Sequence, residues 1–129
     1  MNKKILIAAS IFGLLAVMLG AFAAHSLENK ISIEAIDTFQ TGVKYQMYHA
    51  LLLMFVAHTQ YLKTSTKKAI LYLIIIGVLM FSGSIYGLAT NSLLSFDFKT
   101  IAFITPIGGF LLILSWIVML VGFIKIKEE

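Results

Sequence analysis

The stretch that decides the fold is residues 101–124, which read IAFITPIGGFLLILSWIVMLVGFI without one charged side chain. A helix needs about 20 mostly apolar residues to cross the hydrocarbon core of a bilayer. Residues 5–24 and 69–89 form two further uncharged runs of similar length. A fourth segment, residues 45–62, is the most polar of the set but is still rich in apolar side chains. The sequence therefore predicts four membrane-spanning helices.

The composition of the chain agrees with this class. Of its 129 residues, 60% are hydrophobic and 12% are charged, whereas a soluble domain is about half apolar and about a quarter charged. The net charge is +4, but the basic residues are scattered between apolar runs, so no basic stripe indicates a nucleic-acid partner. The chain has no cysteine, which excludes disulfides and thiolate chemistry. We expect one all-α domain over residues 1–129, embedded in the lipid bilayer.

The N-terminal segment has two interpretations. Lys3 and Lys4 precede the first apolar run, and Ala21-Phe22-Ala23 matches the small-residue pattern of a signal-peptide cleavage site. However, the run is long enough to span a bilayer, and it leads into another membrane segment instead of a secreted domain. We therefore expect a first span, with a cleaved signal peptide as the alternative.

The lysines set the expected orientation, because cytoplasmic segments of membrane proteins carry an excess of basic residues. One side of the predicted topology holds seven lysines, namely Lys3, Lys4, Lys63, Lys67, Lys68, Lys125 and Lys127. The other side holds three, namely Lys30, Lys44 and Lys99. We therefore expect an integral membrane four-helix bundle with both termini in the cytoplasm.

The first outer connection is long enough to have structure of its own. Ser32 can cap a helix, and Glu34 is well placed near the N-terminus of that helix. Residues between Ile33 and Val43 recur at helical spacing. This pattern predicts a short amphipathic helix over residues 32–44, lying on the outer surface and leading into the second span. Gly42 is the expected bend between the two segments.

Polar side chains within a bilayer are costly and tend to face the interior of a helix bundle. At about 1.5 Å of rise per residue, every predicted span places polar residues in its outer half, with His49 about 6–8 Å deep, whereas His58, Gln60, Tyr61 and Tyr72 lie near the inner interface. The polar residues of the outer halves predict one polar cluster near the outer leaflet. Its members are His25, Lys44, Tyr45, Gln46, Tyr48, His49, Ser82, Ser84, Tyr86 and Thr105.

This polar cluster has two explanations. Its groups can hydrogen-bond between helices and fix their packing, or they can form a site for a small ligand, a lipid head group or a proton. No serine has a base and an acid beside it in the sequence, and no predicted span carries an acidic residue. The three histidines lack the spacing of a metal site. We therefore expect no catalytic residue, no metal and no cofactor, in a protein that is not an enzyme.

Small residues mark the surfaces by which the spans pack. Gly108, Ser115 and Gly122 recur every seven residues on the fourth span, and Gly83 and Gly87 form a GxxxG pattern on the third. Such stripes serve contacts within one chain or between chains. A homo-oligomer and a membrane-protein partner therefore both stay open.

Pro106, near the start of the fourth span, has two interpretations. It can lie in the first turn of a helix that begins near Thr105, where a proline costs little, after an extended lead-in over residues 101–104. It can instead kink a longer helix and free a backbone carbonyl at membrane depth.

Four motifs occur in order along the chain: LGAFAAH at residues 19–25, DTFQTGVKYQMYHAL at residues 37–51, FSGSIY at residues 81–86 and TPIGG at residues 105–109. Together they resemble the domain-of-unknown-function 423 family of small uncharacterised bacterial membrane proteins, to which eukaryotic transmembrane protein 256 is related. Ala23 departs from the family pattern, where glycine is common, and Lys44 stands where arginine is common. The resemblance implies a four-helix protein of the bacterial plasma membrane and implies no activity.

We consider two functions. The first is a multi-pass plasma-membrane protein that binds or moves a lipid or a small polar molecule at the outer leaflet, through a cavity lined by His25, Gln46 and His49. The second is a structural or assembly partner of another membrane protein complex, which requires an exposed small-residue stripe such as that from Gly108 to Gly122. An intramembrane enzyme ranks last, because the sequence shows no nucleophile with its base and no metal cluster.

Overall fold

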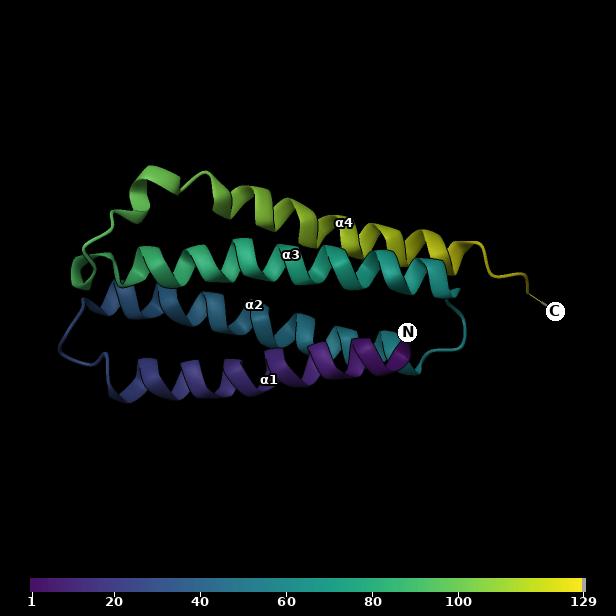
Figure 1. The fold of residues 1–129 in the computed structure, drawn as a ribbon, viewed down its shortest axis with the longest axis horizontal. Coiled ribbons are helices and arrows are strands. Elements are labelled where there is room, and N and C mark those ends of the chain that lie inside the picture. The colour runs from purple at the N-terminus through teal and green to yellow at the C-terminus, as the bar shows by residue number, and fades with distance from the viewer. Residues whose placement is uncertain (129) are drawn as a thin grey trace.

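The computed structural model describes residues 1–128 and consists of four long helices joined by short connections (Figure 1). These elements are α1 (Asn2–His25), α2 (Ile33–His58), α3 (Thr64–Ala89) and α4 (Ile104–Ile124), with the short 3-10 helices η1 (Asn91–Leu93) and η2 (Phe98–Ile101) between α3 and α4. No strand occurs within residues 1–128. The prediction of an all-α fold is confirmed.

Three of the helices, α1, α3 and α4, are long and apolar enough to cross a membrane. α2 is as long, but polar side chains in its first half keep it out of this group. Large apolar side chains cover the outward faces of α1 and α4, among them Leu14, Val17, Phe110, Ile113 and Leu120, each more than half exposed. Such a surface is unfavourable in water and suits a hydrocarbon environment.

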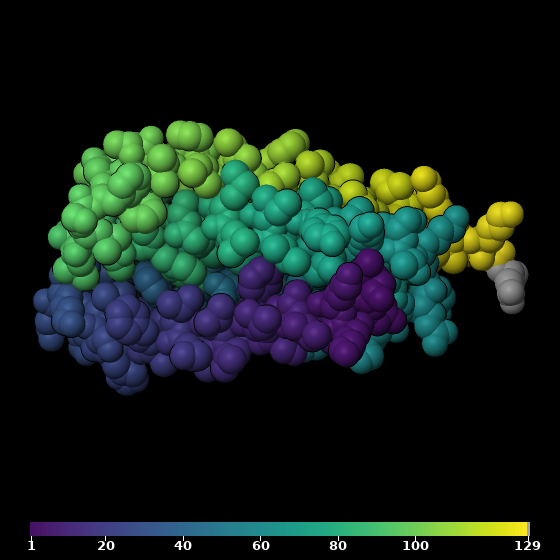
Figure 2. Space-filling view, viewed as in Figure 1, coloured from purple at the N-terminus to yellow at the C-terminus, as the bar shows by residue number. Residues whose placement is uncertain are grey.

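The helices pack side by side in chain order, with α2 between α1 and α3, and α4 along the other side of α3 (Figure 1). α1 and α4 form the two edges of this array (Figure 2). Consecutive helices run in opposite directions, so the N-terminus, the α2–α3 connection and the end of α4 share one end of the molecule. This lysine-rich end contains Lys3, Lys4, Lys63, Lys67, Lys68, Lys125 and Lys127.

One main apolar core joins the four helices. It includes Ile5 of α1, Leu53 of α2, Ile74 of α3 and Leu112 of α4, all of them buried. Because the contributing side chains come from every long helix, the array holds together as one unit.

The predicted segments 32–44 and 45–62 are not two elements, because residues 33–58 form one unbroken helix, α2. Ser32 caps this helix as expected, since its side chain accepts a hydrogen bond from a backbone N–H of the first turn (3.1 Å). The predicted bend at Gly42 is wrong. Gly42 is buried, and a β-carbon added there would lie 2.8 Å from the ring of Tyr86. This glycine permits a close approach of α2 and α3, so the first half of α2 packs within the array and is no separate surface helix.

The end of α2 and the start of α3 both come earlier in the chain than in the predicted spans, and a lysine connects these two helix ends. α2 ends at His58, and α3 begins at Thr64. Lys67, in the first turns of α3, is buried, and its ammonium group donates to the carbonyl of Ala57 and to the side-chain oxygen of Asn2, both at 3.3 Å. A lysine is favourable beside the last carbonyls of a helix. Lys67 therefore links the end of α2 to α1 and α3, in addition to its predicted contribution to the orientation of the protein in the membrane.

α4 begins at Ile104, which places Pro106 in its first turn. The first interpretation of this proline is therefore confirmed, since first-turn N–H groups have no partner within a helix. The 3-10 helix η2 ends at Ile101, just before α4. For residues 101–104 the sequence predicted either part of the spanning helix or an extended lead-in.

The small-residue stripe of α4 packs within the chain. Ser115 is fully buried, and a β-carbon added at Gly108 would lie 2.4 Å from the backbone nitrogen of Phe81 on α3. A β-carbon added at Gly122 would lie 2.6 Å from the end of the Leu62 side chain, so this glycine also packs within the chain. The stripe is therefore not the exposed surface that the assembly hypothesis requires. Gly83 of the predicted GxxxG pattern differs, because a β-carbon added there meets nothing within 4 Å.

Candidate functional site

Gln46 is the member of the predicted polar cluster that joins most helices. It lies on α2 and is 4% exposed. Its amide N–H donates to the carbonyl of Phe12 on α1 (2.9 Å), and its amide oxygen accepts from the hydroxyl of Tyr86 on α3 (2.7 Å). Tyr86 reaches Gln46 from near the end of α3, because helical side chains lean toward the N-terminus of their helix. Both ends of the Gln46 amide are thus bonded to neighbouring helices.

The serine and threonine hydroxyls of the cluster are also hydrogen-bonded within the protein. Ser82 is fully buried and donates to the carbonyl of Gly42 on α2 (2.7 Å). Ser84 donates to the carbonyl of Phe81 (3.0 Å) and shares a hydrogen bond with the hydroxyl of Thr105 on α4. Hydrogen bonds between membrane helices each contribute about 0.6 kcal/mol on average. These contacts fit the packing explanation of the cluster.

His49 lies on the part of α2 that faces α4, and it is 4% exposed. Its Nδ1 is 2.7 Å from the carbonyl oxygen of Tyr45, and its Nε2 is 3.2 Å from the indole nitrogen of Trp116 on α4. An indole N–H can only donate, so Nε2 must accept. Nδ1 then carries the proton and donates to the carbonyl. The geometry therefore selects a neutral imidazole with its proton on Nδ1.

A groove of about 430 Å³ lies beside His49, over α3 and between α2 and α4. Its walls are mainly aromatic and aliphatic, and they consist of Tyr45, His49, Phe81, Pro106, Gly109, Phe110, Leu112, Ile113 and Trp116. The ring of Tyr45 packs against that of Phe81, with 5.1 Å between centroids. Trp116 is 47% exposed, so the groove is open toward the surroundings. It exists because α2 and α4 both pack on α3 and remain apart above it.

Three predicted members lie outside these contacts, because His25, Lys44 and Tyr48 are exposed. His25 is 13 residues beyond Phe12 along α1, a distance of about 20 Å, whereas Gln46 bonds to Phe12 itself. His49 faces α4 instead. The structure therefore does not bring His25, Gln46 and His49 to one cavity, and the predicted cluster divides into separate contacts.

His49 also lies deeper along its helix than the sequence indicated. The predicted depth assumed a span that starts at Tyr45, but α2 starts at Ile33, about 24 Å away along the helix axis. Trp116 lies about 18 Å from the start of α4. The hydrogen bond between Trp116 and His49 was not predicted from the sequence. No spacing pattern in the sequence pairs these two residues.

Within residues 1–128, no group of three histidine, cysteine, aspartate or glutamate side chains is placed to hold a metal ion. The buried hydroxyl of Ser115 donates to the carbonyl of Leu112 (2.6 Å), as those of Ser82 and Ser84 do to other carbonyls. The groove beside His49 is open to the surroundings, so a ligand can reach it.

Comparison with known proteins identifies a family and several relatives of this chain. The sequence profile of a family described as "Protein of unknown function (DUF423)" matches residues 19–109. A UPF0382 membrane protein of Haemophilus influenzae is 35% identical over 128 residues, 99% of this chain and 99% of the relative. The chain belongs to this family.

Other members of the DUF423 family have the same extent. The UPF0382 membrane protein YwdK of Bacillus subtilis is 38% identical over 125 residues, 95% of this chain and 98% of the relative. The UPF0382 inner membrane protein YgdD of Escherichia coli K12 is 35% identical over 132 residues, 99% of this chain and 95% of the relative. No solved structure matches. The matched range begins and ends with the first and last of the four sequence motifs, which confirms the resemblance drawn from them.

Proposed function

We propose that this protein is a non-enzymatic membrane protein that binds a lipid at the outer leaflet, with one acyl chain in the groove between α2 and α4. The observation that carries the proposal is the apolar lining of this groove beside His49. Its volume of about 430 Å³ falls within the range of about 300–1,000 Å³ that is usual for ligand pockets. Both ring nitrogens of His49 are hydrogen-bonded within the protein, so His49 offers the groove no free polar group. Its part of the groove wall therefore suits a hydrocarbon chain.

The proposal includes four membrane crossings in a bacterial plasma membrane, with both termini in the cytoplasm. α2 is packed between α1 and α3, two helices of spanning length, which supports its crossing with them. Seven of the ten lysines lie at one end of the molecule, and such an excess favours the cytoplasmic side. The Pro106 end of the groove then faces the outer leaflet.

A lipid chain is a better occupant of this region than a small polar molecule. The side chains that would recognise a polar ligand, such as Gln46 and Ser82, are bonded to carbonyl or hydroxyl groups of neighbouring helices. Binding a polar molecule would require those hydrogen bonds to break. An acyl chain requires only the apolar surface that the groove already exposes.

Trp116 provides the test, because it is the single tryptophan of the chain and it lines the groove. A phospholipid with a brominated chain quenches tryptophan fluorescence on contact. Titrated into purified protein in detergent, it should quench Trp116 at lipid fractions too low for random contact. Gly109→Leu should weaken this quenching, because Gly109 lies in the wall of the groove and a leucine would fill the space.

Gly83→Leu is the matched control, because it adds the same side chain to an exposed position of α3. This variant should be quenched as the unmodified protein is. Equal quenching of the two variants and the unmodified protein, proportional to bulk lipid, would show that the groove holds no lipid.

An assembly role is the second candidate, favoured by the exposed face of α2. Asp37, Thr41, Lys44 and Tyr48 are exposed there and lie along one line of the helix. Polar side chains that face lipid are costly, and a partner protein would cover them. In this cysteine-free chain, Thr41→Cys should then cross-link to a neighbouring protein in membranes, whereas Leu79→Cys on α3 should not. Equal cross-linking at both positions would speak against this surface.

A further inference from the structure

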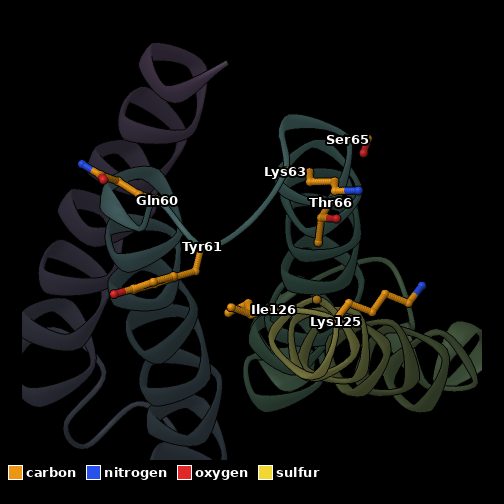
Figure 3. A pocket seen from close by; sticks show the side chains of 8 residues that line it. Gln60, Tyr61, Lys63, Ser65, Thr66, Lys125 and Ile126 are labelled. Atoms are coloured by element: carbon orange, nitrogen blue, oxygen red, sulfur yellow. The ribbon is translucent and has the colours of Figure 1, made fainter. Parts of the chain in front are cut away.

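A second cleft lies at the lysine-rich end of the molecule, at the opposite end from the Pro106 side of the groove. It has a volume of about 540 Å³ and lies between the end of α2, the first turn of α3 and the end of α4 (Figure 3). Lys63, Ser65 and Thr66 contribute from the start of α3, and Lys125 comes directly after α4. In Figure 3 the Lys63 and Lys125 side chains extend toward the same side.

The chemistry of this cleft favours an anion. Its described lining includes two lysines and no carboxylate. The first turn of α3 holds no acidic residue, and Lys63 provides no side-chain cap, so the positive N-terminal end of this 26-residue helix is not offset there. The hydroxyls of Ser65 and Thr66 can donate further hydrogen bonds. Ammonium groups, hydroxyls and helix N–H groups together match a phosphate.

An apolar groove of about 270 Å³ continues from this cleft along α4. Ile117, Val118 and Val121 line it, and it shares Thr66 and Lys125 with the cleft. The two spaces adjoin at these shared residues, and a path along both leads from positive charge to hydrocarbon. A free anion would use only the first part, whereas an amphipathic molecule would use both.

We propose that this path binds an anionic phospholipid, with the phosphate between Lys63 and Lys125 and one acyl chain along Val118 and Val121. A net negative headgroup is preferred over a zwitterionic one, because two lysines line the cleft and no lining carboxylate repels it. The site differs from the groove beside His49 in position and in charge. It depends on neither that groove nor the orientation of the protein in the membrane.

Native mass spectrometry of the full-length protein tests this site. Phosphatidylglycerol should be retained in preference to phosphatidylcholine with the same chains. Each lysine removed should weaken phosphatidylglycerol binding about fivefold, the effect expected for one basic residue at an anionic surface. Lys63→Gln with Lys125→Gln is the test pair, and Lys4→Gln with Lys68→Gln is the control pair, which removes the same charge at the same end from residues outside the cleft.

The outcomes separate the sources of the phosphate. Loss of binding in the test pair alone supports the site. Equal loss in both pairs, or equal retention of the two lipids, overturns it. Glycerol phosphate, which has the headgroup chemistry without chains, is the probe for a free anion. If it binds as tightly as phosphatidylglycerol, the apolar groove contributes nothing and the lipid assignment is wrong.

Discussion

Among single residues, Gln46 shows how one amide can hold three helices in register. Its amide N–H donates to the carbonyl of Phe12 on α1, and its amide oxygen accepts from the hydroxyl of Tyr86 on α3. The partners fix the position of the side chain from both sides. In a bilayer the backbone and the apolar side chains do not specify this register alone, because lipid is as apolar as the helix surfaces.

Tyr86→Phe should therefore destabilise the protein by about 1 kcal/mol, because it leaves the amide oxygen of Gln46 buried without a donor. Unfolding by sodium dodecyl sulfate in mixed micelles measures this change. In a Gln46→Leu background the same substitution should cost much less, since the acceptor is already gone. Equal costs in the two backgrounds would contradict the hydrogen bond as the source of stability.

At the scale of helices, the contact between α3 and α4 depends on a glycine. A β-carbon at Gly108 would lie 2.4 Å from a backbone nitrogen of α3, and backbone cannot move aside as a flexible side chain can. The buried Ser115 continues the same contact face. The α4 stripe thus holds the edge helix of the array on α3.

Gly108→Ala should lower stability by about 2 kcal/mol, because α4 must move away from α3 to make room. Gly83→Ala is the matched substitution on an open helix face, and it should be neutral or slightly stabilising, since alanine favours helix over glycine by up to about 1 kcal/mol. The midpoint of unfolding in mixed micelles compares the two. A similar loss in both variants would show that helix propensity, and not the close contact, governs the change.

For the molecule as a whole, the sequence predicted best where the chain is uniformly apolar. Most of α1, α3 and α4 lies in uninterrupted apolar runs, and length alone identifies such runs as helices that can span a bilayer. The continuity of α2 was missed, because exposed polar residues such as Asp37, Thr41 and Lys44 make its first half resemble a surface segment. Spacing along one helix shows which residues share a face. It does not show which neighbour that face meets, so the bond from Trp116 to His49 could not be predicted.

Cysteine labelling can test whether α2 crosses the membrane, because the chain has no cysteine of its own. Ser26, Ser65 and Ser95 are exposed and lie in the first connection, in the first turn of α3 and in the last connection. In the proposed topology, a membrane-impermeant maleimide added to intact spheroplasts should label Ser26→Cys and Ser95→Cys, and should label Ser65→Cys only after lysis. If α2 stayed on one face of the membrane, Ser26→Cys and Ser65→Cys would react together. The inverse pattern at all three positions would keep the four crossings but place the lysine-rich end outside, against the tendency of basic residues to remain in the cytoplasm.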